Sequence, residues 1–129
     1  MQKNQAIIKF LIGITLLATV FHMVVLLKII PFQIVWGGRL QTVQDMYVFE
    51  LGSILINAFF IFVLLQKGMF IKSIFSNKAL SIILWIFFAV FLLNTIGNLL
   101  AKSTFEKLFT IVTLTNAACI WKINKTVKL

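Results

Sequence analysis

The sequence predicts an all-α integral membrane protein that folds as a single bundle of four transmembrane helices. Hydrophobic residues make up 61% of the 129 residues and charged residues only 12%, whereas a soluble domain carries about 25% charged residues. The apolar residues also fall into four separate runs, each close to the roughly 20 residues that a helix needs to cross a bilayer. Because lipid-exposed backbone must satisfy its own hydrogen bonds, we expect helices rather than open strands.

The four expected helices cover residues 6–30, 46–65, 79–100 and 108–123 of one domain, residues 1–129. The first is expected to be a retained span and not a cleaved secretory signal, because its apolar part exceeds the usual length of roughly 7 to 15 residues. The uncharged part of the second run, residues 51–65, is short for a membrane span. This helix is therefore expected to begin several residues earlier and to carry Glu50 just inside the interface. The fourth is short and rich in Thr and Asn, which predicts that the other helices shield it.

The distribution of Lys and Arg predicts the orientation. Eight of them fall on the side of the chain ends and the middle connection, namely Lys3, Lys9, Lys67, Lys72, Lys78, Lys122, Lys125 and Lys128. Four fall on the opposite side, namely Lys28, Arg39, Lys102 and Lys107. Because cytoplasmic loops carry the excess of basic residues, we expect an up-down-up-down bundle in the cell membrane with both termini cytoplasmic.

The same basic residues also indicate the partners. They sit singly between long apolar runs and form no dense patch with interleaved aromatic residues. Their expected partners are therefore the lipid bilayer and anionic lipid headgroups on the cytoplasmic side, and nucleic acid is not expected.

The longest connection, residues 31–45, is expected to lie along the outer interface. Pro31 should stop the first helix, because proline lacks an amide hydrogen and its ring clashes with the preceding turn. Trp36 is expected at the level of the headgroups, with Arg39 close to Asp45 or Glu50. The middle connection has apolar residues at helical spacing with Lys between them, which fits a short surface helix. An anchoring turn is the favoured interpretation.

Each expected helix carries one stripe of polar residues at helical spacing. Ionisable and amide side chains are costly in hydrocarbon and tend to face the bundle interior. Their depths suggest an outward-facing polar cavity, for which we select five candidate ligand-binding residues: His22, Glu50, Asn57, Asn94 and Asn98. Thr and Asn alone are more often interhelical hydrogen-bonding residues. The carboxylate of Glu50 and the imidazole of His22 are what favour a site.

The sequence excludes several kinds of chemistry and leaves three functions open. It has no zinc-ligand spacing and no Gly-rich phosphate loop, so neither a metal nor a cofactor is expected. The first hypothesis is a protein that binds or transports a small polar or cationic molecule or a lipid. The second is an accessory subunit of a membrane complex or a homo-oligomer. The third and least favoured is an enzyme that uses Glu50 and His22 as acid and base on a lipid.

In size and helix count the chain resembles the small multidrug resistance transporters. That family places a membrane Glu in its first helix, whereas this chain has no acid in its first expected helix and Glu50 opens the second. The proton-antiport mechanism that the resemblance implies is therefore not expected here.

Overall fold

The structure, a computed structural model, describes residues 4–125 and is helical throughout that range apart from its connections. The helices are α1 (Gln5–Leu26), α2 (Val43–Lys67), α3 (Asn77–Leu99) and α4 (Thr104–Asn124), with the short 3-10 helices η2 (Phe32–Ile34) and η3 (Trp36–Gly38) between α1 and α2. Helices α1, α2 and α3 are each long and apolar enough to cross a membrane. Helix α4 has 21 residues but is less apolar, because it carries charged residues and several Thr and Asn.

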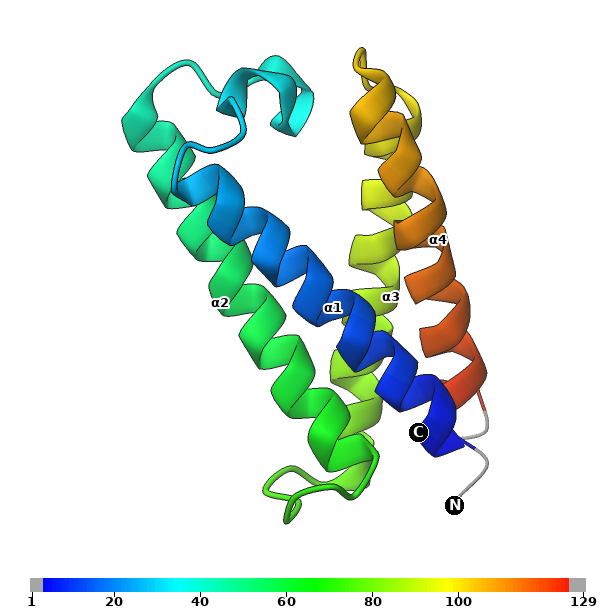
Figure 1. The fold of residues 1–129 in the computed structure, drawn as a ribbon. Coiled ribbons are helices and arrows are strands. Elements are labelled where there is room, and N and C mark those ends of the chain that lie inside the picture. Colours follow the sequence, from blue (N-terminus) through cyan, green and yellow to red (C-terminus); the bar gives the residue numbers. More distant parts are fainter. Residues whose placement is uncertain (1–3, 126–129) are drawn as a thin grey trace.

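Successive helices run antiparallel, so the chain forms two hairpins, α1–α2 and α3–α4 (Figure 1). One end of the molecule contains the start of α1, the α2–α3 connection and the end of α4. We call it the Lys67 end, and the opposite end, with the other two connections, the Trp36 end. The hairpins meet toward the Lys67 end and diverge toward the Trp36 end (Figure 1).

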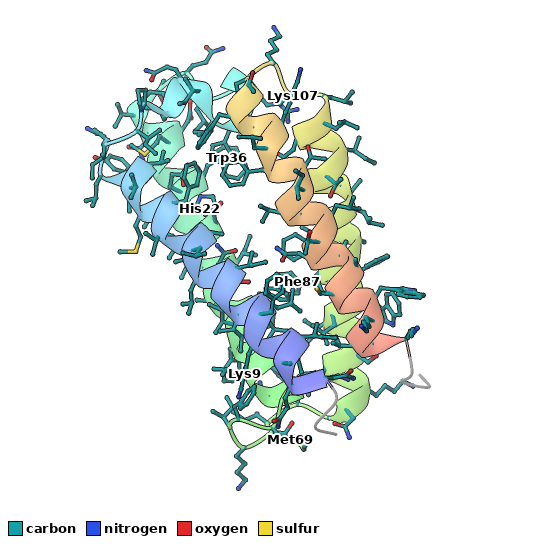
Figure 2. The ribbon with its side chains drawn as sticks, turned by 45° about the vertical axis from the view of Figure 1, so that its right-hand side comes forward. Lys9, His22, Trp36, Met69, Phe87 and Lys107 are labelled. Carbon is teal, nitrogen blue, oxygen red and sulfur yellow. The ribbon has the colours of Figure 1, made fainter. Side chains whose placement is uncertain are left out.

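The main hydrophobic core lies where the two hairpins meet. Phe60 of α2 is buried and packs against Phe87 and Phe91 of α3, with ring centroids 4.5 and 5.5 Å away. Figure 2 shows Phe87 between the hairpins. Aromatic pairs at these separations add about 0.5–1.5 kcal/mol beyond area burial. The other buried members of this core are Ile8, Leu11, Val63, Leu64, Leu80, Leu84, Ile120 and Ile123.

Buried hydrogen bonds join α3 to α4. Ser81 Oγ donates to Asn124 Oδ1 over 2.8 Å, and Asn124 Nδ2 donates back to the Ser81 carbonyl oxygen over 2.9 Å. Toward the Trp36 end, Thr95 Oγ1 lies 2.9 Å from Thr113 Oγ1. These polar groups therefore fix how α3 and α4 pack, as the sequence analysis expected of Thr and Asn within helix interfaces.

Helix α1 ends at Leu26, four residues before the expected end at residue 30. The amide of Lys28 donates to the Val25 carbonyl and that of Ile29 to the Val24 carbonyl, which is the Schellman pattern of a helix C-terminus. Lys28 adopts a left-handed conformation with φ 60°. The helix thus ends in a Schellman turn that forms before the chain reaches Pro31, so the proline is not what ends it.

The other helices begin slightly earlier than expected, because side chains cap their first turns. Thr42 and Asp45 form a capping box at α2, which starts at Val43 rather than residue 46. Ser103 caps α4, which starts at Thr104 rather than residue 108. The α2–α3 connection contains no helix, in agreement with the anchoring turn that the sequence favoured.

Candidate functional site

A cluster of three side chains from three elements lies at the Trp36 end. Glu50 of α2 is fully buried, and its Oε2 lies 2.6 Å from Nδ1 of His22 on α1. Its Oε1 accepts a hydrogen bond of 2.8 Å from Nε1 of Trp36. We call His22, Trp36 and Glu50 the Glu50 cluster. A proton must lie between Nδ1 and Oε2, because two facing lone pairs would repel at that distance.

Trp36 reaches Glu50 because of an unusual backbone turn. Trp36, Gly37 and Gly38 are all left-handed, with φ 56°, 66° and 71°. Glycine adopts this conformation freely, whereas a residue with a Cβ loses about 1–2 kcal/mol in it. The indole ring also contacts the rings of His22 and Phe49, at centroid distances of 6.2 and 5.1 Å. Strain held in place by such contacts is typical of functional sites.

The expected place of Trp36 at the level of the headgroups stays a prediction, and the structure adds a partner for it within the protein. Its side chain is only partly exposed, and its indole N–H bonds to buried Glu50. Figure 2 shows Trp36 and His22 at the same end of the molecule. The indole N–H thus finds its acceptor inside the protein, as is usual for a partly buried tryptophan.

Glu106 of α4 links the α1–α2 connection to the α3–α4 hairpin. Its Oε1 accepts from the Gly37 amide, and its Oε2 accepts from Ser103 Oγ over 2.8 Å. Sequence reasoning did not select Glu106 as a site residue. The signal was available, because Ser103 and Glu106 have the spacing of a capping box. The connection between α1 and α2 thus contacts α4 as well as α2.

Arg39 pairs with neither Asp45 nor Glu50, contrary to the expectation from sequence. Asp45 accepts from the Thr42 amide in the capping box, and Glu50 is occupied by His22 and Trp36. Within residues 4–125, the pair formed by His22 and Glu50 is the only salt bridge. Arg39 is exposed, so its charge is available to groups outside the protein.

Asn57 links α2 to α1 about two helical turns from Glu50, toward the Lys67 end. Its Nδ2 donates to Thr19 Oγ1 over 3.2 Å, and Thr19 donates in turn to the Thr15 carbonyl. Asn57 is thus engaged in helix packing, the alternative that the sequence analysis kept open for it.

Asn94 and Asn98 lie on α3 and are not part of the Glu50 cluster. They follow Phe87 and Phe91 at helical spacing, so the four residues share one face of α3. Phe87 and Phe91 contact Phe60 of α2, so this face is directed toward α2. Asn94 is exposed and Asn98 is partly exposed, and within residues 4–125 neither side-chain amide takes part in a hydrogen bond. Their side-chain amides therefore have no hydrogen-bonding partner among the described residues, at the end of the molecule where the two hairpins diverge (Figure 1).

A hollow of about 320 Å³ lies on the α2 surface that continues from Phe60 toward the Trp36 end. We call it the α2 hollow, and its lining is Trp36, Val48, Phe49, Gly52, Ser53 and Ile56. The only hydroxyl in this lining, that of Ser53, donates to the Phe49 carbonyl of its own helix. The hollow is therefore apolar, and none of the five candidate ligand residues lines it.

Comparison with known proteins finds no similar protein. No protein-family model matches the chain, and neither a curated protein nor a solved structure matches it. Among residues 4–125, no group of three or more His, Cys, Asp or Glu side chains could hold a metal ion.

Proposed function

We propose that the chain is a multi-pass protein of the cell membrane, with all four helices spanning the bilayer and the Lys67 end in the cytoplasm. The three long apolar helices support this arrangement. The excess of basic residues at the Lys67 end supports the orientation. Those within the described range are Lys9, Lys67, Lys72, Lys78, Lys122 and Lys125.

Within that setting, the function is to bind a lipid-like amphipathic molecule between α2 and α3. The observation that carries this proposal is that the apolar α2 hollow lies on α2 beyond Phe60, while Asn94 and Asn98 share the face of α3 whose Phe87 and Phe91 contact Phe60. Apolar lining with a few placed polar groups is the usual composition of a small-molecule site. An exposed amide in a membrane-spanning helix also needs a hydrogen-bonding partner.

The level of the amides favours a lipid-like ligand. Asn94 lies five residues before the end of α3 at Leu99, which corresponds to about 7.5 Å along the helix axis. Ester and hydroxyl groups of a lipid lie just below its headgroup, at a comparable level. Arg39 and Lys102 are exposed at the Trp36 end, where each can contact a headgroup phosphate.

The Glu50 cluster then acts by positioning and does not contact the ligand directly. Both oxygens of Glu50 are occupied and its side chain is inaccessible. Its effect on the ligand passes through Trp36, whose ring lines the α2 hollow. The same burial disfavours the enzyme hypothesis, because an acid or base must lie within hydrogen-bond reach of its substrate.

Photocrosslinking in nanodiscs tests this function. The probe is a phospholipid with a diazirine in its acyl chain, and the crosslinked peptides are mapped by mass spectrometry. We expect adducts to concentrate at residues 48–56, where the α2 hollow lies. Gly52→Leu adds a side chain to the lining of the hollow, and its Cβ meets no atom within 4 Å. This variant should reduce the adducts about tenfold, the effect of a 1.4 kcal/mol loss of affinity.

Gly13→Leu is the matched control, because Gly13 is also a helical glycine facing open space and it lies on α1 away from the hollow. It should leave the adducts at 48–56 unchanged. Labelling that is equal over all lipid-facing helix surfaces, or equal in the two variants, would contradict the proposal.

A second candidate function is favoured by the exposure of Asn94 itself. An unpartnered amide on a membrane helix can also bond to a helix of another protein or of a second copy of this chain. The chain would then be an accessory subunit or a homo-oligomer. In the same experiment, protein-to-protein crosslinks at Asn94 in place of lipid adducts would support this function.

A further inference from the structure

A second cavity lies at the Lys67 end, far from the Glu50 cluster. Its volume is about 390 Å³, and residues of all four helices and of the α2–α3 connection line it. We call it the Gln66 cavity. Its lining residues are Asn4, Gln5, Ile8, Gln66, Lys67, Gly68, Met69, Ser73, Asn77 and Ile123.

Gln66 lines this cavity and carries a buried hydrogen-bond donor without a partner among the described residues. Its side chain is 1% exposed, and its Oε1 accepts from the amides of Ile74 and Phe75 over 2.7 and 3.0 Å. These two donors fix the orientation of the amide group, because a flipped amide would place Nε2 against two N–H groups. Within residues 4–125, Nε2 then has no acceptor. A buried donor without an acceptor costs about 1–3 kcal/mol, so Nε2 favours a ligand that supplies one.

The rest of the cavity is also suited to a negative ligand. Lys67 adds a cation next to Gln66, and Asn77 adds the first turn of α3, where backbone amides and the helix dipole attract anions. No acid lines the cavity. The three acids of the chain, Asp45, Glu50 and Glu106, all occupy the half of the molecule toward the Trp36 end.

We propose that the Gln66 cavity binds a phosphate group. Gln66 and Lys67 of α2 and Asn77 in the first turn of α3 line the same cavity, and donors from two helices suit an anion with several oxygens better than a single-atom ion. The lysine supplies a point charge of the kind that binds phosphates in other proteins. The phosphate comes either from the headgroup of a membrane lipid or from free phosphate in solution, and this site is independent of the one between α2 and α3.

Two variants remove the proposed contacts. Gln66→Glu keeps the Oε1 acceptor for Ile74 and Phe75 but replaces the donor with a negative oxygen. Lys67→Gln removes the cation and keeps a polar side chain. Their matched controls are Gln33→Glu and Lys72→Gln, which make the same changes at exposed residues that do not line the cavity.

The test uses the full chain purified in a mild detergent. Binding of inorganic phosphate is measured by calorimetric titration, and binding of phosphatidylglycerol and phosphatidylcholine by native mass spectrometry. We expect Gln66→Glu and Lys67→Gln each to weaken binding about tenfold or more, a change of 1.4 kcal/mol or more. The two controls should bind as the parent does, and circular dichroism verifies that each variant retains its helices.

The two sources of phosphate give different results. Binding of phosphatidylglycerol without inorganic phosphate assigns the site to a lipid headgroup, and binding of inorganic phosphate assigns it to the free ion. The proposal is overturned if neither binds, or if the variants bind as tightly as their controls. If Gln66→Glu fails to fold, Lys67→Gln decides between these outcomes.

Discussion

Nδ1 of His22 lies 2.6 Å from Oε2 of Glu50 and joins α1 to α2 across 28 positions of sequence. Because Glu50 is fully buried, loss of either partner leaves a polar group without a partner in a low-dielectric region. We therefore expect His22→Ala and Glu50→Ala to be strongly non-additive.

A double-mutant cycle on the free energy of unfolding in mixed micelles measures this coupling. We expect a coupling energy of about 1–3 kcal/mol, within the range of contacting residues. His22 and Asn116, which occupy different helices and share no hydrogen bond, provide the comparison cycle, for which additivity within about 0.5 kcal/mol is expected. Additivity of His22 and Glu50 to the same degree would show that their contact contributes nothing to stability.

Trp36→Phe tests the hydrogen bond from the indole to Glu50 while keeping an aromatic ring against His22 and Phe49. We expect a loss of about 1.5–3 kcal/mol in the free energy of unfolding, as for a hydrogen bond to a charged group. Lipid crosslinking at the α2 hollow should fall as well, because Trp36 lines it. Trp85→Phe is the control, since Trp85 Nε1 forms no hydrogen bond within residues 4–125. Equal stability losses for the two variants would contradict the role assigned to Trp36.

The parts of the fold that sequence predicts best are those that depend on composition and periodicity. Long apolar runs give helices, and the cost of an ionisable group in hydrocarbon explains why Glu50 turns inward. The capping box at Thr42 and the Ser103 side-chain cap can also be predicted from local sequence, and they account for the earlier starts of α2 and α4.

Two other features could not be predicted from the sequence. They depend on how the helices pack against one another, or on backbone conformations that the sequence allows but does not require. Gly37 and Gly38 allow a left-handed turn, but only the acceptors at Glu50 and Glu106 explain why Trp36 joins it. Likewise, the helical spacing of Asn94 and Asn98 identifies their common face. Their distance from the Glu50 cluster follows from the divergence of the two hairpins, which no local pattern encodes.

Two glycine substitutions should have opposite effects on stability. Gly38 is left-handed, with φ 71°, and a Cβ there comes no closer than 3.8 Å to another atom, the Gln33 carbonyl oxygen. Gly38→Ala should therefore lose about 1–2 kcal/mol through the backbone alone. Gly13 is helical with open space around it, so Gly13→Ala should gain about 1 kcal/mol. Thermal unfolding in detergent measures both, and a stabilised Gly38→Ala would contradict the left-handed turn.

The proposed topology makes a prediction that needs no knowledge of the ligand. If four helices span the membrane with the Lys67 end inside, a reporter at Gln41 faces outward and a reporter fused after Leu129 faces the cytoplasm. The second placement depends on α4, which is less apolar than the other helices and carries charged residues near both of its ends. Paired fusions to a phosphatase active only outside the cytoplasm and a fluorescent protein active only inside it measure the two positions. A chain with only α1, α2 and α3 spanning the membrane would place both reporters on the same, outer side. That result would require α4 to lie outside the bilayer, and it would overturn the four-span arrangement while leaving the three apolar helices intact.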